Sequence, residues 1–165
     1  MSTKRLSVYT VQLVRESSMR YEVPQGQIRN DFNAAEIIGQ YLRNVDREHF
    51  VVLLLNHKYQ ITGIHTAHIG TLTGAAVSAR EVFKVAILSN AAAIMVGHNH
   101  PSGNPVPSPR DIALTHRLSW AGQILDIPLL DHIIVAFDLG GTLSHYSLKN
   151  NGELEAPKED TPCIS

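Results

Sequence analysis

Apolar and polar positions along the chain predict strands and helices in alternation. Apolar runs predict strands at residues 50–55, 59–70, 91–98, 128–137 and 142–148. Apolar residues at helical spacing, each behind a capping residue, predict helices at residues 31–44, 79–89 and 109–124. A short polar turn joins residues 50–55 to residues 59–70, so these two strands are expected to form a hairpin. The whole order favours an α/β fold, with a mixed sheet flanked by helices in three layers.

Two flanking segments stand apart from this pattern. Residues 6–14 alternate loosely and predict an edge strand, with which residues 20–23 could pair as a hairpin, and Pro24-Gln25-Gly26 then predicts a turn. We therefore expect residues 1–29 to form an N-terminal extension with an edge strand or hairpin. Residues 30–148 contain the predicted strands and helices of the main domain. The polar residues 149–165 predict a disordered tail.

Composition narrows the class of protein. The 165 residues, 44% hydrophobic and 18% charged, suit one globular domain with a buried core. The single cysteine, Cys163, excludes an internal disulfide and a cysteine-rich zinc site, and it suits a reducing compartment. The sequence shows neither a signal peptide nor an apolar run long enough for a membrane span. We therefore expect a cytoplasmic protein without a membrane partner.

The residues with the clearest chemistry form the pattern H-x-H-x7-S-x2-D. His98 and His100 end a predicted strand, where positions i and i+2 point to one face. A proline-rich loop leads to Ser108 and Asp111, which begin the next helix. Two imidazoles and one carboxylate leave an open coordination position, the ligand count of a catalytic zinc site. The pattern predicts one Zn²⁺ per chain, held by His98, His100 and Asp111.

Each half of this pattern also has a simpler interpretation. Ser108 and Asp111 are typical of a capping box that begins a helix. His98 and His100 alone are also compatible with a polar strand end. The joint occurrence of all four positions favours the metal site.

The stretch GHNHPSGNPVPSPRD, residues 97–111, resembles the JAMM (MPN+) metalloprotease motif. Around it, SAREVFKVAILSNAAAIMVGHNHPSGNPVPSPRDIALTHRL and the later LLDHIIV resemble the bacterial RadC family, over about residues 32–148. The resemblance implies a curved mixed sheet in three α-β-α layers, as in JAB/MPN and cytidine-deaminase-like folds. It also implies a zinc-dependent hydrolase that cleaves a peptide or isopeptide bond of a peptide or protein substrate.

The resemblance further implies roles for residues outside the ligand set. Glu48, ahead of an apolar strand, corresponds to the family's general base and later general acid. In that mechanism, Ser108 stabilises the oxyanion. By residue type alone Glu48 is typical of a solvated position, and a capping box already accounts for its rival Glu81. His132 belongs to an Asp-His pair typical of RadC proteins, so it is a candidate for supporting a metal ligand.

Other functions compete with this hypothesis. RadC proteins carry a DNA-repair name, but their N-terminal helix-hairpin-helix region needs more residues than this chain offers. MPN domains that have lost their ligands act as scaffolds, whereas all three ligands are present here. A zinc nucleobase deaminase has a similar layered fold, yet its P-C-x-x-C half needs more than one cysteine.

The charge of the chain makes a prediction about nucleic acid. A net charge of −1 gives no basic footprint, so we predict weak DNA binding that falls steeply with salt. Titration of labelled duplex and single strand at two salt concentrations measures both properties. Nanomolar binding at physiological salt would contradict the prediction and favour a nucleic-acid function.

Overall fold

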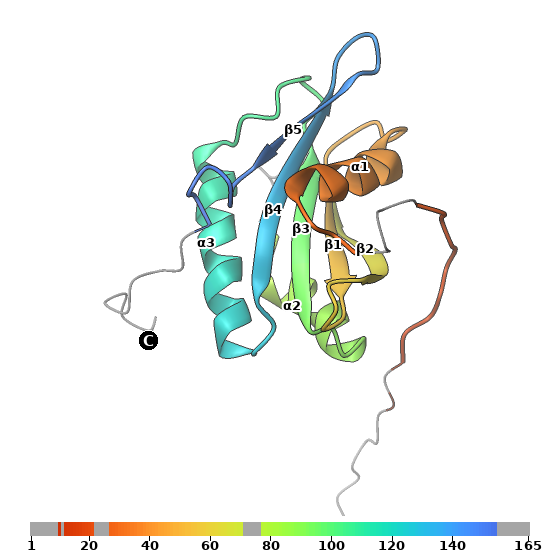
Figure 1. The fold of residues 1–165 in the computed structure, drawn as a ribbon, viewed down its shortest axis with the longest axis vertical. Helices are drawn as coiled ribbons and strands as arrows, with labels where there is room; N and C mark the ends of the chain where they lie inside the picture. Colours follow the sequence, from red (N-terminus) through yellow and green to blue (C-terminus); the bar gives the residue numbers. More distant parts are fainter. Residues whose placement is uncertain (1–9, 11, 22–26, 71–76, 155–165) are drawn as a thin grey trace, which may run out of the picture.

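A mixed five-stranded sheet forms the centre of the molecule (Figure 1). The computed structural model describes residues 10, 12–21, 27–70 and 77–154. The strands are β1 (His49–Leu55), β2 (Ile61–Ile69), β3 (Ala93–Asn99), β4 (Leu129–Phe137) and β5 (Leu143–Ser147). Their order is β2-β1-β3-β4-β5. β3 and β4 are parallel, whereas the β1–β2, β1–β3 and β4–β5 pairs are antiparallel, so the predicted mixed sheet is confirmed.

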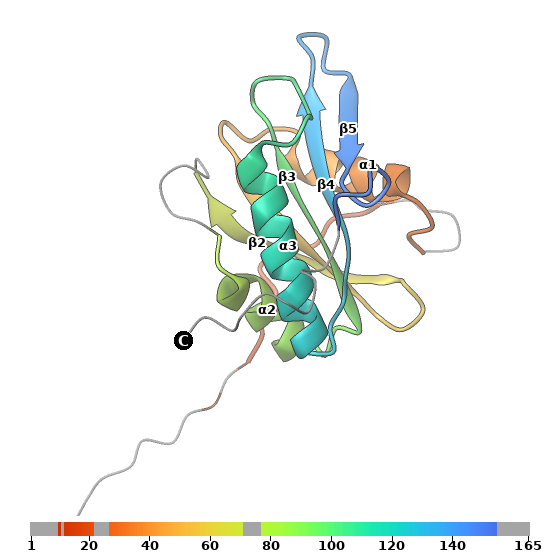
Figure 2. The same cartoon turned by 90° about the vertical axis from the view of Figure 1, so that its left-hand side faces the viewer.

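Three helices cover the two faces of this sheet (Figures 1 and 2). They are α1 (Asp31–Leu42), α2 (Ala79–Leu88) and α3 (Pro109–Ile124). Val51 and Leu53 of β1 share a buried cluster with α1. Val52 and Leu54 point to the opposite face and share a second cluster with α2 and α3. β1 is therefore buried on both sides, and the three-layer α/β architecture is the predicted one.

The caps predicted from the sequence begin these helices. Asn30 caps α1, with its side-chain oxygen 2.9 Å from the Asn33 nitrogen. Capping boxes begin α2, at Ser78, and α3, at Ser108. α1 ends at Leu42, two residues before the predicted end. Within the described ranges, no helix combines the length and hydropathy needed to cross a membrane.

The predicted N-terminal hairpin differs from the structure. The described part of its two strands, residues 10, 12–14, 20 and 21, lies outside any strand, and residues 6–9, 11, 22 and 23 lie outside the described ranges. Gln27 instead makes a single antiparallel bridge to Gln60. In the described part of residues 6–14, the alternation marks no buried face, since Leu13 and Val14 are 51% and 75% exposed.

The predicted disordered tail is wrong over residues 149–154. The Tyr146 hydroxyl donates to the Glu153 carboxylate at 3.1 Å, and the partly buried Leu154 packs against the α2–α3 cluster. A polar composition favoured disorder, but these two residues find partners on the folded domain. Residues 155–165 lie outside the described ranges.

Close packing at Gly97 gives a prediction for stability. A Cβ atom on Gly97 of β3 would lie 2.6 Å from Ile38 Cδ1 and 2.8 Å from the Ile133 backbone oxygen. The backbone oxygen cannot move aside as readily as a flexible side chain. The clash in Gly97→Ala should therefore lower the free energy of unfolding by about 1–3 kcal/mol. Gly63→Ala is the control, because its Cβ would meet the flexible end of Leu54, at 3.3 Å. Urea denaturation that ranks the two variants equally would contradict this account.

Candidate metal centre

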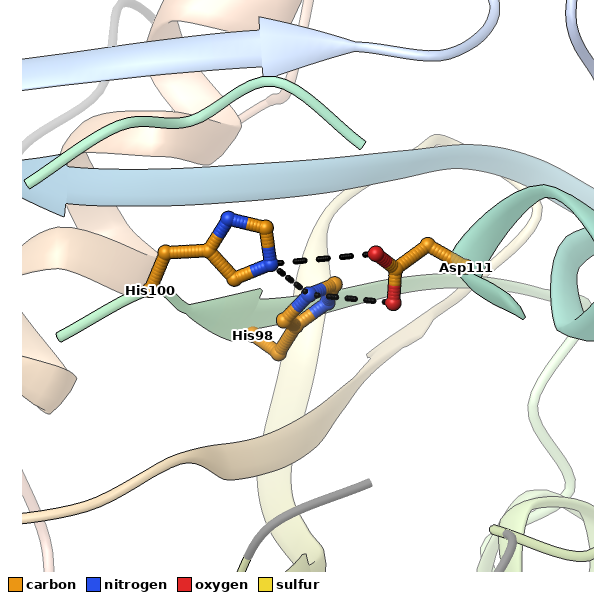
Figure 3. A group of neighbouring side chains, drawn as sticks. All are labelled: His98, His100 and Asp111. Atoms are coloured by element: carbon orange, nitrogen blue, oxygen red, sulfur yellow. Dashed lines mark hydrogen bonds and ion pairs between the residues drawn. The ribbon is translucent and has the colours of Figure 1, made fainter. Parts of the chain in front are cut away.

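The three predicted metal ligands converge where β3 ends and α3 begins (Figure 3). His98 Nε2 lies 3.0 Å from His100 Nε2 and 3.4 Å from Asp111 Oδ1. His100 Nε2 lies 3.7 Å from Asp111 Oδ2. His98 and Asp111 are almost fully buried, whereas the His100 side chain is 15% exposed. The structure therefore brings together residues that the sequence separates by a long loop.

The capping box and the ligand set share one carboxylate. The Ser108 backbone N–H and hydroxyl donate to Asp111 Oδ2 at 2.7 and 2.6 Å. These two bonds fix the carboxylate and leave Oδ1 directed at His98. The capping interpretation of Ser108 and Asp111 is thus correct, and it does not compete with the metal interpretation.

The donor set fits a zinc ion. Among the residues that the structure describes, Asp111 Oδ1 is buried without a hydrogen-bond partner, a condition that costs free energy unless a cation or donor satisfies it. Ligands of a tetrahedral ion with bonds of about 2.0–2.2 Å lie about 3.3–3.6 Å apart. His98 Nε2 lies 3.0 Å from His100 Nε2 and 3.4 Å from Asp111 Oδ1, which is close to that range. One donor atom from each of the three residues lies within 4.8 Å of the other two. His98, His100 and Asp111 are therefore the residues that would hold Zn²⁺.

Burial and neighbouring charges shift the pKa values of the three candidate ligands in different directions. Burial lowers the pKa of His98 well below its usual value, which keeps this ring neutral, as a metal ligand must be. The Asp111 carboxylate, whose Oδ2 lies 3.7 Å from His100 Nε2, raises the pKa of His100. Burial opposes the charged form of Asp111, but the neighbouring His100 and the bonds from Ser108 outweigh it, so the pKa of Asp111 is held below its usual value. A cation entering the site must displace the proton that Asp111 favours on His100.

Glu48 lies beside this centre, immediately before β1. It is half-buried, its backbone oxygen accepts from the Gly70 N–H at 2.9 Å, and its charge contributes to the raised pKa of His100. The rival Glu81 is exposed, and its carboxylate accepts from the Ser78 backbone N–H at 3.2 Å in the capping box of α2. Of the two carboxylates considered from the sequence, Glu48 is the one whose charge acts on a candidate ligand.

Asn99, between the two ligand histidines, was missed in the sequence analysis. Its side-chain oxygen accepts from the His49 N–H at 2.8 Å, and its side-chain nitrogen donates to the Arg47 carbonyl at 3.0 Å. One amide therefore holds the backbone on both sides of Glu48. A polar residue at the end of a buried strand was the available signal, because buried polar side chains need partners.

His132 lies behind His98, on β4. It is fully buried, and its Nε2 lies 2.9 Å from His98 Nδ1. Its Nδ1 lies 2.6 Å from the hydroxyl of Thr115, a residue that the sequence analysis did not single out. Burial lowers the pKa of His132 to about 4. The position of Thr115, one helical turn after Asp111, was the signal in the sequence.

Comparison with known proteins places this site inside a family match. The model of the RadC-like JAB domain matches residues 28–153, which include every site residue described above. A UPF0758 protein of Desulforamulus reducens is 47% identical over 125 residues, which cover 76% of this chain and 53% of that protein. A UPF0758 protein of Shouchella clausii is 42% identical over 142 residues, covering 86% of this chain and 60% of that protein. The chain thus spans between half and two thirds of the length of these relatives.

The raised pKa of His100 predicts how zinc binding depends on pH. Zinc must displace the His100 proton, so below that pKa the apparent dissociation constant should rise about tenfold per pH unit. His98 adds no such proton near neutral pH, because its pKa is lowered. Competition with a chromophoric chelator between about pH 8 and about pH 5.5 measures the slope.

A double variant controls for zinc bound elsewhere. His98→Ala with His100→Ala removes two of the three donors, so it should hold no zinc. Full zinc stoichiometry in that variant, or affinity independent of pH in the unmodified protein, would place the ion at another site.

Proposed function

The chain belongs to the RadC-like JAB domain family, and from that premise we propose that it is a zinc-dependent hydrolase of peptide or isopeptide bonds. The observation that supports this proposal most directly is the buried, unpartnered Oδ1 of Asp111, which lies 3.4 Å from His98 Nε2 in the same cluster as His100. A three-donor set of this kind leaves one coordination position for a reacting molecule.

His98, His100 and Asp111 would hold the ion. Zinc bound by such a set supplies Lewis acidity: it polarises a substrate carbonyl and lowers the pKa of water to about 7. The exposure of His100 and the burial of His98 leave the solvent side of the centre, beside His100, as the side that a substrate approaches.

Glu48 is the proposed proton carrier. It takes the proton of the attacking water and delivers it to the leaving amine, so one carboxylate serves as base and then as acid. Two observations support this role. Its charge acts on His100, and Asn99 holds the backbone on both sides of it.

In this mechanism, Ser108 acts on the ligand Asp111. Its hydroxyl donates to Asp111 Oδ2 at 2.6 Å, which supports a role in orienting that ligand. Stabilisation of an oxyanion by Ser108, predicted from the resemblance, requires the same hydroxyl to rotate away from the carboxylate, because it has one proton to donate.

Replacement of Glu48 by its amide tests the proposal. Glu48→Gln preserves the shape of the side chain but cannot carry the proton. It should therefore keep zinc and stability, yet lose about 10²–10⁴-fold in hydrolytic rate. The assay is a screen of peptide and isopeptide substrates with zinc-loaded protein, repeated after chelation and after zinc is restored.

Glu81→Gln is the matched control for the same chemical change. Glutamine still serves a capping box, so this variant should remain active. Loss of activity in Glu81→Gln with wild-type activity in Glu48→Gln would show that the wrong carboxylate was assigned. An unmodified protein that holds no zinc and cleaves nothing would instead support the non-catalytic scaffold.

A further inference from the structure

A buried chain of hydrogen bonds leads from α3 to the far side of His98. Thr115 Oγ1 lies 2.7 Å from the Asp111 backbone oxygen and 2.6 Å from His132 Nδ1. His132 Nε2 lies 2.9 Å from His98 Nδ1. Thr115, His132 and His98 are each 0% exposed, so bulk water does not compete for these bonds.

The position of the proton on His132 follows from the first of these bonds. A carbonyl oxygen only accepts, so the Thr115 hydroxyl donates its single proton to the Asp111 backbone. Thr115 Oγ1 can then only accept from His132. His132 Nδ1 must therefore carry a hydrogen.

The same elimination determines the tautomer of His98. Full burial disfavours a charged imidazole, so His132 with a hydrogen on Nδ1 has a bare Nε2. That bare atom accepts from His98, which places a hydrogen on His98 Nδ1. In a neutral His98, the lone pair is then on Nε2, the atom that faces Asp111 Oδ1 at 3.4 Å.

The hydrogen on His100 Nδ1 is fixed by a simpler route. His100 Nδ1 lies 2.8 Å from the Asn104 backbone oxygen. Because a carbonyl oxygen can only accept, His100 Nδ1 must be the donor and must carry a hydrogen. His98 instead faces another histidine, which by itself can either donate or accept. Without the Thr115 hydroxyl, a His132 hydrogen on Nε2 would force the His98 proton onto the atom needed by the metal.

We propose that Thr115 is a positioning residue that, through His132, holds His98 in the tautomer able to bind zinc. The proposal rests on the zinc site of the proposed function, because it concerns the readiness of one of its ligands. α3 then supplies both the ligand Asp111 and, one turn later, the hydroxyl that orients the proton of a second ligand on β3.

The tautomers can be measured directly in the metal-free, unmodified protein. Long-range ¹⁵N–¹H correlation NMR should show His98 and His132 both neutral, each with its hydrogen on Nδ1. A hydrogen on His132 Nε2 would overturn the proposal. This spectrum needs neither zinc nor a variant. If the protein fails to bind zinc, that result counts against the proposed function, but the spectrum still shows which tautomers His98 and His132 adopt.

Removal of the hydroxyl should weaken metal binding. Thr115→Val preserves the shape of the side chain, and we expect its Zn²⁺ dissociation constant to rise about 10–100-fold, with mixed tautomers at His98. Thr115→Ser keeps the hydroxyl and should restore both the affinity and the single tautomer.

Thr62→Val is the control for loss of a hydroxyl elsewhere. The Thr62 hydroxyl donates to the Leu54 backbone oxygen at 3.2 Å, away from the metal ligands, so zinc affinity should not change. Wild-type affinity and an unchanged His98 spectrum in Thr115→Val would also overturn the proposal. If Thr115→Val does not fold, the spectrum of the unmodified protein still distinguishes the two tautomers of His132 and so supports or overturns the proposal.

Discussion

The Asp111 carboxylate joins the fold of this protein to its candidate metal centre. One of its oxygens completes the capping box that begins α3, and the other is buried 3.4 Å from Nε2 of His98 on β3. Since Ser108 fixes the first oxygen, the direction of the second is set by the helix itself. The position of α3 against the sheet therefore decides whether the three donors meet.

The two histidines differ because the strand passes from the core to the surface between them. His98 is fully buried, and burial keeps it neutral. His100, two residues later, is partly exposed and lies 3.7 Å from the Asp111 carboxylate, which favours its protonated form. This gradient leaves one side of the centre dry and the other accessible, as a hydrolytic site requires.

Each residue that supports the centre lies close in sequence to one metal ligand but contacts a residue far along the chain. Asn99 stands between the two histidines and holds the backbone around Glu48. Thr115 stands one turn beyond Asp111 and contacts His132. Each support residue belongs to the same strand or helix as a ligand, so a shift of that element would move ligand and support together.

Local patterns in the sequence predicted the helix starts, the buried strand β1 and the three converging donors, because caps, apolar runs and i, i+2 geometry depend on residues a few positions apart. The contacts of Asn99 with residues 47 and 49 and of His132 with His98 span many more positions. They depend on which strands pair and in what register, as does the ordered turn at residues 149–154. Only the tertiary structure determines those pairings, since a hydrogen-bond partner far along the chain leaves no periodic signal in either segment.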